Sequence, residues 1–422
     1  MKISLVVARI NGLDGVALQV VEYANVLASL GYEVQIITGE DEKGVYGNPS
    51  YPKGVSVVLN EELSLKSPDR LFLYKGQFMD GETGWVDVIG KSSEAIFESL
   101  NSLVSDSSVV LVFNFLALRH YHPGAAVGLK KLVEKNQDKT FISHAADPDS
   151  ERPEVVSKLS EFARKWLSNN ELSYSGGPLD RENLHHIVLN PEQEKCFRRY
   201  GITKIFNIPD FVNLPTGGYC ESRRLIEMFN RNLVSGSGDI TEEDTFFLAP
   251  VRPVRRKRIK EAMDLMSNSK PKGVMVVTHP SSDDPDYAME VRKYAIERNI
   301  RYVYLGSKCT HEMLHEIYSV MSSLKTVSIV GSKAGGFENA ILESISYNIP
   351  VVVSKRLNSF PVLSELGFRI GNFDEDDVFN YIDGSLDFER HEIVNVNKKR
   401  LSEFFSRDAA KKRVSKMLET VS

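Results

Sequence analysis

Cysteine is scarce in this sequence, and long apolar runs are missing altogether. The chain has 3 cysteines, Cys196, Cys220 and Cys309, which lie far apart and form no C-x-x-C pair. This number and spacing argue against a disulfide framework and a structural zinc site, and they suit a reducing setting. No stretch approaches the roughly 18 apolar residues of a membrane-spanning helix, and the run after Lys2 is shorter than a secretory signal. We therefore expect a cytoplasmic protein, for which peripheral docking to a membrane stays an open alternative.

An excess of positive charge is also missing. Lys and Arg number 52 against 57 Asp and Glu, which gives a formal net charge of -5 at pH 7. No overall field therefore draws the chain onto nucleic acid or an anionic membrane, and an anionic ligand must be held by a local group of cations and amides. The 422 residues, 42% of them hydrophobic, are too many for one hydrophobic core and predict two domains.

Short runs rich in Val and Ile alternate with segments of helical period, which is typical of parallel strands joined by crossover helices. Strands of the first half are expected at 3–8, 33–38, 55–59, 109–113, 140–143, 186–189 and 204–208. After 214–243, a segment that mixes Pro, Gly and Ser with one expected helix at 225–229, strands are expected at 246–248, 273–277, 302–304, 327–330 and 350–353. The sequence thus predicts an α/β protein with two doubly wound, Rossmann-like domains.

We place the first domain at 1–213 and the second at 214–395, with a helical segment at 396–422 that packs back on the first. Parallel sheets of this kind bind ligands at the carboxyl ends of their strands. We therefore expect the two sheets to face each other across a cleft that holds the site.

The segment 331–354 places a glycine pair between an expected strand and an expected helix. Amides at a helix start suit a phosphate, and Gly335 and Gly336 let it approach without a Cβ atom in the way. Glu343, two helical turns on, shares a face with Gly336 and can accept hydrogen bonds from a ribose diol. A plain helix start with a surface glutamate is the alternative, because glycine pairs are common there.

A basic run at 249–259 follows another expected strand. Arg252 and Lys257 would stand at the carboxyl end of that strand, where a guanidinium and an ammonium can neutralise a diphosphate. Charge runs usually decorate surfaces. We therefore interpret the other arginines of the run as solvated charge or a weak partner patch: Arg255, Arg256 and Arg258.

The histidines and acidic pairs leave more than one interpretation open. His144 ends an expected strand and would point into the cleft, to bind a sugar hydroxyl or assist proton movement; a structural histidine is the alternative. The Asp-Pro-Asp triplets at 147–149 and 284–286 supply two carboxylates each, a weak metal site. His120 and His122 could hold zinc, but no third ligand is evident, so an acceptor contact or a plain loop is preferred.

Five of these segments occur in an order that resembles the GT-B glycosyltransferases, and within them the family-4-like retaining enzymes. They are the loop 12–16 with the following helix and the strand after Gly31, His144, the IPDFVN segment at 208–213, the R-x4-K pair Arg252 and Lys257, and an E-x7-E-like segment at 335–343. The resemblance covers most of the chain. Each segment alone is a weak signal, whereas their common order is specific.

The resemblance implies transfer of a hexose from a UDP-, GDP- or ADP-linked sugar to an acceptor hydroxyl, with retention of the anomeric configuration and without a cofactor or metal. Arg252, Lys257 and His144 would be catalytic. The donor contacts that it implies are Gly15, Gly335, Gly336, Phe337, Glu338, Asn339 and Glu343. The acceptor-side residues that it implies are Gly12, Asp14, His120 and Arg152. The acceptor is expected to be a glycan, a glycolipid or a small acidic molecule, because 114–118 and 144–152 resemble a subgroup that uses phosphoglycerate-type acceptors.

One departure from the family pattern keeps a second hypothesis open. The first signature glutamate, which contacts the donor sugar in resembling enzymes, is Gly335 here. A non-catalytic sugar-nucleotide binder or partner subunit is therefore the alternative, against which the retained Arg252, Lys257 and Glu343 argue. A Rossmann oxidoreductase is disfavoured because the first strand lacks G-x-G-x-x-G, and a metal-dependent D-x-D transferase fits two α/β halves less well.

Overall fold

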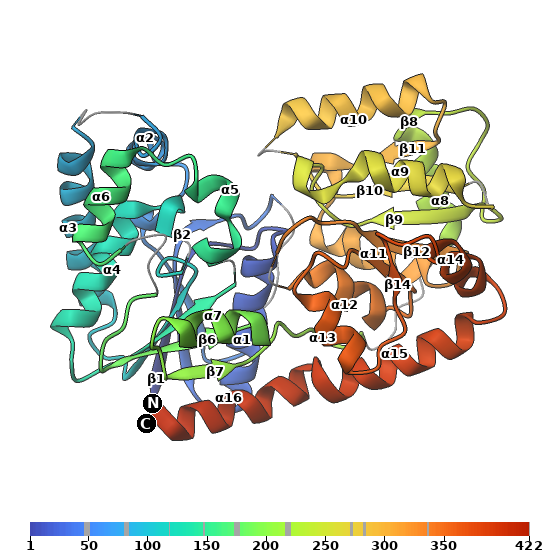
Figure 1. Cartoon of the computed structure of the whole chain (residues 1–422). Coiled ribbons are helices and arrows are strands. Elements are labelled where there is room, and N and C mark those ends of the chain that lie inside the picture. The colour runs from blue at the N-terminus through green and yellow to red at the C-terminus, as the bar shows by residue number, and fades with distance from the viewer. Residues whose placement is uncertain are drawn as a thin grey trace. The chain divides into compact units, whose positions relative to one another are not determined.

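The computed structural model describes the backbone of residues 1–421 except 46–50, 80–83, 118, 147, 173–177, 216–220, 271–272, 282–283 and 336. The chain divides into two compact units, Met1–Asp210 with Ala410–Ser422 and Phe211–Ala409 (Figure 1). Because the positions of the units relative to one another are not determined, each unit is described by itself. Among the described residues, no helix has both the length and the apolar character to span a bilayer.

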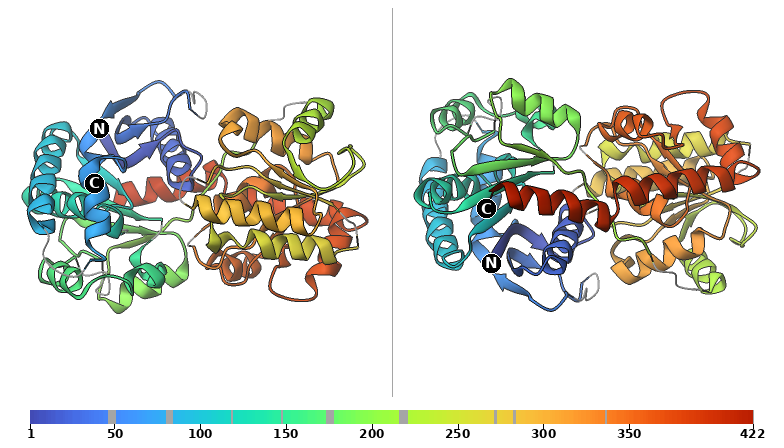
Figure 2. Two further views of the ribbon diagram at one scale, coloured as in Figure 1. Left: turned by 90° about the horizontal axis from the view of Figure 1, so that it is seen from above. Right: turned by 90° about the horizontal axis from the view of Figure 1, so that it is seen from below.

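A parallel sheet of seven strands forms the centre of the first unit, in the order β3-β2-β1-β4-β5-β6-β7. Its strands are β1 (Lys2–Ile10), β2 (Glu33–Asp41), β3 (Val55–Leu59), β4 (Val109–Phe113), β5 (Thr140–Ala145), β6 (Leu184–Val188) and β7 (Ile205–Asn207). The central strand β4 is an apolar run buried along its length, and β5 is buried from Phe141 onward, as expected of strands that helices cover on both faces (Figure 2). All seven strands expected in this half are confirmed.

Most helices of this unit connect successive strands, and α16 joins them from the end of the chain. They are α1 (Gly15–Ser29), α2 (Pro68–Gly76), α3 (Trp85–Leu103), α4 (Pro123–Lys135), α5 (Pro153–Val156), α6 (Glu161–Asn169), α7 (Pro191–Arg199) and α16 (Arg407–Val421), with 3-10 turns η1 (Glu61–Leu63), η2 (Arg119–Tyr121) and η3 (Asp149–Glu151). From Ala410 onward, α16 belongs to this unit, where Thr140 donates to the carbonyl of Val421 at 3.1 Å. The two chain ends therefore lie close together, as both views of Figure 2 show.

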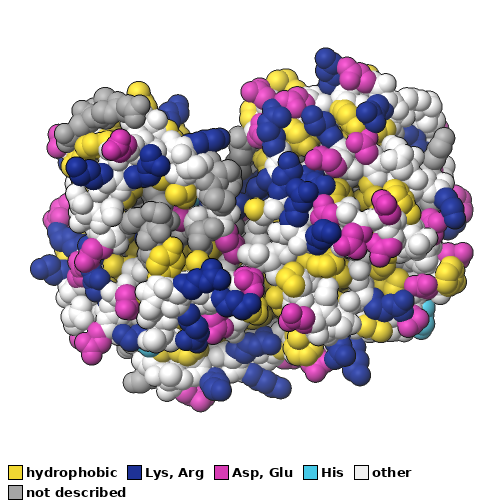
Figure 3. All heavy atoms as spheres, in the orientation of Figure 1, with side chains coloured by type: hydrophobic (Ala, Val, Ile, Leu, Met, Phe, Trp, Pro, Cys, Tyr) yellow, Lys and Arg dark blue, Asp and Glu magenta, His cyan; other side chains and the backbone are white. Residues whose placement is uncertain are grey.

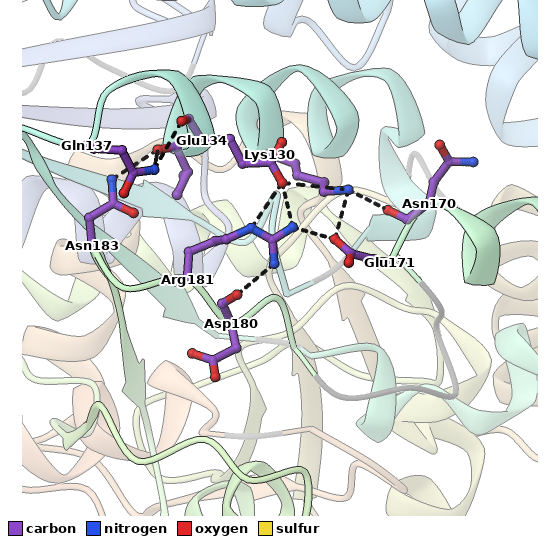
Figure 4. A network of polar contacts seen from close by, with 9 residues as sticks. Lys130, Glu134, Gln137, Asn170, Glu171, Asp180, Arg181 and Asn183 are labelled. Carbon is purple, nitrogen blue, oxygen red and sulfur yellow. Dashed lines mark hydrogen bonds and ion pairs between the residues drawn. The ribbon is translucent and has the colours of Figure 1, made fainter.

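An ion-pair network ties α4 to the segment that leads into β6 (Figure 4). Arg181 reaches Glu134 with two nitrogens, at 3.0 and 2.5 Å, and also pairs with Glu171. Lys130 lies 3.1 Å from the same Glu171. Asn183 adds three hydrogen bonds to carbonyl groups at the end of α4 and just beyond it.

Over the face of the molecule seen in Figure 3, Lys and Arg side chains are interspersed with Asp and Glu side chains, so that no charge of one sign dominates this face.

The second unit holds another sheet of seven strands, in the order β14-β13-β12-β9-β10-β11-β8, and only β8 runs antiparallel to its neighbour. Its strands are β8 (Leu233–Ser235), β9 (Thr245–Ala249), β10 (Gly273–Val277), β11 (Tyr302–Tyr304), β12 (Thr326–Val330), β13 (Val351–Val353) and β14 (Gly371–Asn372). Its helices are α8 (Ser222–Arg231), α9 (Ile259–Asn268), α10 (Pro285–Glu297), α11 (His311–Met321), α12 (Asn339–Ser346), α13 (Ser359–Glu365), α14 (Val378–Leu386) and α15 (Arg390–Phe404), with the 3-10 turns η4 (Arg255–Lys257) and η5 (Gly306–Lys308). The five expected strands are confirmed, and the edge strands β8 and β14 are additional.

The chain passes between the units twice, and the two passing segments pair with each other. Val212 forms a parallel bridge with Ser406. Its amide donates to the carbonyl of Phe405 at 3.0 Å, and its own carbonyl accepts from the amide of Arg407 at 3.1 Å. The backbone entering the second unit is thus hydrogen-bonded to the backbone leaving it.

Candidate active site

The predicted phosphate site is built on the segment that follows β9. Lys257, in η4, is only 5% exposed, which is rare for a lysine. Its ammonium lies 2.5 Å from a carboxylate oxygen of Glu338. Arg256 Nη1 lies 3.2 Å from the other oxygen of Glu338 and donates to the carbonyl of Ala334 at 3.2 Å. Two cations of the basic run therefore meet on one carboxylate of the glycine-rich segment.

The interpretation of Arg255, Arg256 and Arg258 as solvated charge is wrong for two of the three. Only 27% of the Arg256 side chain and 12% of the Arg258 side chain are exposed, and Arg258 pairs with Asp374 at 2.5 Å. Arg255 is 60% exposed and pairs with Glu290, as expected of a surface charge. The partners of these two partly buried arginines lie 82 and 116 residues away in the sequence. A local charge pattern carries no trace of such distant partners.

The ion pair of Lys257 and Glu338 responds to pH through its cation. Burial, and then the charge of Arg256, lowers the pKa of Lys257 to about 7, against the opposing attraction of Glu338. Burial alone would raise the pKa of Glu338, but the attraction of Lys257 and then Arg256 outweighs it and lowers that pKa to about 2. Arg252 also lowers the pKa of Lys257, so both predicted phosphate ligands act within one small region.

Gly335 shapes the space that Glu338 occupies. Its φ of +155° is a conformation that residues with a side chain rarely adopt, and a Cβ atom there would lie 2.9 Å from Glu338 Oε1. Glu338 is the N-cap of α12, yet its side chain makes no capping hydrogen bond, because it turns toward Lys257. Gly336, the other glycine of the predicted pair, lies outside the described residues.

The neighbouring residues of the predicted donor set are packed into the unit. The ring of Phe337 is 8% exposed and lies 5.2 Å from the ring of Phe405. Asn339, the first residue of α12, is also 8% exposed. The ring of Phe337 serves packing, so a donor contact at this position would come from its backbone.

Glu343 lies on α12 and receives a hydrogen bond that the sequence did not reveal. The hydroxyl of Tyr318, on α11, donates to Glu343 Oε2 at 3.2 Å. Tyr318 is buried and stacks on Tyr347 at 5.3 Å. Burial, and then the charge of Glu343, raises the pKa of Tyr318, so its hydroxyl keeps its proton and remains a donor. Glu343 Oε2 thus accepts a hydrogen bond from a buried tyrosine.

His144, in the first unit, is fully buried at the end of β5. Its ring stacks on Phe113 at 4.7 Å and meets the ring of Tyr23 edge-on at 5.3 Å. Neither ring nitrogen hydrogen-bonds to another of the residues that the structure describes, and burial lowers the pKa of His144 to about 3. The imidazole is therefore neutral at physiological pH, which suits a hydrogen bond to a sugar hydroxyl better than proton transfer as an imidazolium.

The predicted acceptor-side histidine belongs to a buried polar cluster. His120 Nδ1 lies 2.5 Å from Asp149 Oδ1, and Arg119 Nε lies 3.1 Å from Asp149 Oδ2. All three side chains are at most 4% exposed. Arg152 is 8% exposed, and its amide donates to the carbonyl of Asp149 at 3.0 Å. The structure thus brings His120 and Arg152 together around Asp149, a residue that the sequence suggested only as a weak metal ligand.

Two carboxylates of the protein lie at the loop after β1, those of Asp14 and Glu42. Asp14 accepts from the amide of Ala17 at 3.2 Å as the N-cap of α1, whose first residue is Gly15, and pairs with Arg9 at 2.8 Å. A Cβ atom at Gly12 would lie 2.6 Å from Glu42 Oε2, so any other residue there would displace the Glu42 carboxylate. The start of α1 is thus capped by protein groups.

The remaining metal candidates have structural roles. His122 Nδ1 accepts from the amide of Ala125 at 3.1 Å as the N-cap of α4, and Asp284 accepts from the amide of Tyr287 at 3.1 Å as the N-cap of α10. Cys196 and Cys309 are free thiols, whereas Cys220 and Asp147 lie outside the described residues. Within the described part of the chain, no three His, Cys, Asp or Glu side chains gather as metal ligands.

Two curated proteins resemble the chain along most of their length, although no family model matches it. A mannosylglucosylglycerate synthase of Thermotoga maritima is 24% identical over 380 residues, which cover 84% of this chain and 80% of that protein. A mannosylglucosylglycerate synthase of Petrotoga mobilis is 23% identical over 399 residues, which cover 88% of this chain and 86% of that protein.

Solved structures match the fold over its full length. Sucrose-phosphate synthase from Thermosynechococcus elongatus superposes with a TM-score of 0.70 at 15% identity and covers 100% of this chain and 99% of its own. Anabaena Alr3699/HepE in complex with UDP-glucose superposes with a TM-score of 0.65 at 12% identity and covers 100% of both chains. These superpositions show that the chain has the GT-B fold of two parallel α/β sheets, and its sequence is similar to that of two mannosylglucosylglycerate synthases.

Proposed function

We propose that the enzyme transfers a hexose from a nucleoside diphosphate sugar to a hydroxyl of a small acidic acceptor that contains a glycerate group, without a metal ion. The observation that carries the acceptor is the match to two mannosylglucosylglycerate synthases over more than four-fifths of the chain. UDP-glucose is the first donor to test, because HepE, which shares the fold, was solved in complex with it. GDP- and ADP-linked hexoses are the alternatives.

The proposed donor site uses the cations around Glu338. As the bond between the sugar C1 and the diphosphate oxygen breaks, negative charge grows on the diphosphate. Arg252, Lys257 and the start of α12 would stabilise that charge, with support from Arg256. Protein cations then do the work that a divalent ion does in other transferases. Glu343, steadied by Tyr318, would accept the ribose hydroxyls.

The chemistry that follows is a substitution on one face of the sugar. The acceptor oxygen bonds to C1 on the side from which the diphosphate leaves, through an oxocarbenium-like state, and the acceptor proton moves to the departing phosphate oxygen. The neutral imidazole of His144 would hydrogen-bond to the hexose. His120 and Arg152 would lie on the acceptor side, where a guanidinium suits a carboxylate.

The proposal is tested with purified enzyme, a panel of UDP-, GDP- and ADP-hexoses, and three acceptors: glucosylglycerate, glycerate and glucose. We expect turnover with an acidic acceptor, unchanged activity in EDTA, and a product whose anomeric configuration, read by NMR, equals that of the donor. Arg252→Ala and Lys257→Ala should each lower turnover by about 10²-fold, as for loss of a charge-stabilising donor. Turnover of neutral glucose in preference to both acids would refute the acceptor assignment.

A second candidate, a non-catalytic sugar-nucleotide binder, is favoured by the absence of a side chain at Gly335. It predicts that a nucleotide sugar raises the melting temperature by mass action while no acceptor in the panel is glycosylated. Turnover with any acceptor would exclude it.

A further inference from the structure

In the second unit, the carboxylate of Glu338 lies between the buried Lys257 and the partly buried Arg256. It contacts Lys257 at 2.5 Å and Arg256 at 3.2 Å, and only 14% of its side chain is exposed. Arg252 is close enough to shift the charge equilibrium of Lys257. Two cationic side chains thus contact one carboxylate, and the charge of a third, Arg252, acts on Lys257. The cations already bind one carboxylate of the protein itself, that of Glu338.

An ammonium as buried as that of Lys257 needs a partner to stay charged. Burial and the neighbouring Arg256 and Arg252 all favour the neutral amine, and Glu338 is the group that opposes them. A neutral amine would not stabilise the charge of a leaving diphosphate. An ammonium has three N–H donors, so Lys257 can bond to Glu338 and still donate to a phosphate oxygen.

The glycine at 335 fits this arrangement. A side chain there would meet the Glu338 carboxylate at 2.9 Å and would have to tolerate a φ of +155°. Glycine leaves this space to Glu338. Residues 335 and 338 therefore act as a pair, in which the absence of a side chain at one position permits the contact made by the other.

We propose that Glu338 is a positioning residue whose carboxylate keeps the ammonium of Lys257 charged and fixed where the donor diphosphate binds. This inference rests on the proposed function. Glu338 would hold the Lys257 ammonium before the sugar nucleotide binds, and the two would stay paired when the diphosphate binds. The opposite arrangement, in which Glu338 competes with the diphosphate for the same cations, predicts the opposite sign of every effect on donor binding.

The test compares wild type with Glu338→Gln, which keeps the shape and removes the charge. We expect the basic limb of the kcat/KM profile for the donor to move to lower pH, with a loss of about tenfold at pH 7.5 that largely recovers near about pH 6. Glu338→Asp should recover part of the loss. Adding Lys257→Arg to Glu338→Gln should abolish this limb, because a guanidinium stays charged when buried.

A measurement without donor separates this inference from the proposed function. Because the folded-state pKa of Lys257 is lowered, the amine loses its proton as pH rises. The melting-temperature deficit of Glu338→Gln should therefore be largest near about pH 6 and shrink toward about pH 9, and this trend should vanish in a Lys257→Met background. If Glu338→Gln fails to fold, Gly335→Ala, which crowds the same carboxylate, serves in its place.

The outcomes are distinguishable. A donor affinity that is unchanged or tighter in Glu338→Gln at every pH would overturn the positioning role while the proposed function stands. A wild-type enzyme that binds no nucleotide sugar would overturn the proposed function, and a pH-dependent deficit would then mark the pair as purely structural. A shifted limb that Lys257→Arg removes would support both.

Discussion

Gly335→Glu, which introduces the glutamate that resembling GT-B enzymes carry at this position, should destabilise this protein and weaken its binding of a sugar nucleotide. Gly335→Glu places a side chain on a backbone with φ of +155°, a strain of roughly 1–3 kcal/mol. It also brings a second carboxylate toward that of Glu338, and two like charges ~4 Å apart repel by about 4 kcal/mol at an effective dielectric constant near 20. We expect the variant to lose stability of that order and to bind UDP-glucose or any other donor more weakly. Chemical unfolding and donor titration by calorimetry measure both.

Two matched variants divide this effect into its parts. Gly335→Ala keeps the backbone strain without the charge, so it should lose less stability than Gly335→Glu by roughly the repulsion. Gly335→Glu combined with Glu338→Gly moves the carboxylate from one position to the other and should recover the repulsive part alone. If Gly335→Glu instead raised the affinity for the sugar nucleotide or the turnover, a side chain at position 335 would not displace the Glu338 carboxylate, and the reasoning would be refuted.

Three further predictions concern other parts of the site. In Lys257→Arg the basic limb that we expect in the wild-type kcat/KM profile near about pH 7 should disappear, since a guanidinium does not titrate there; a limb that persists assigns it to another group. Tyr318→Phe removes the hydroxyl that donates a hydrogen bond to Glu343. It should raise the KM for the sugar nucleotide severalfold with little change in kcat, because the proposed contact of Glu343 with the ribose is alike in the ground and transition states; a fall in kcat alone would contradict this. His144→Phe removes two buried nitrogens that bond to no other described residue, so unfolding by urea should show equal or higher stability by about 1 kcal/mol while kcat/KM falls; a clear destabilisation would mean that the ring is structural.

The sequence predicts best the strands that are buried by apolar packing alone, without a specific polar contact to another residue. The run Val109–Phe113 is apolar at every position because helices cover both faces of its sheet, and its composition alone predicts β4. The edge strands β8 and β14 have three and two residues, and their pairing depends on neighbours rather than on their own pattern. Such short edge strands leave no periodicity to detect.

Burial of charge is the part of the site that sequence could not supply. Arg255, Arg256 and Arg258 look alike in the run, and only their partners distinguish them: Glu290 at the surface, Glu338 and Asp374 inside. The same holds for Asp149, which appeared as half of a weak metal site and instead holds Arg119 and His120. The sequence named Glu338 among the expected donor contacts, whereas its ion pair with Lys257 became visible only through distances.

The doubled connection at Val212 and Ser406 makes residues 211–409 a cassette carried inside the rest of the protein. Because residues 1–210 and 410–422 both belong to the other unit, a chimera that exchanges this cassette requires two splices. Those splices fall close to two backbone segments that are hydrogen-bonded to one another, so both segments must be exchanged together. Grafting the cassette from a relative as one piece is therefore the way to exchange the second unit while leaving the first unit unaltered.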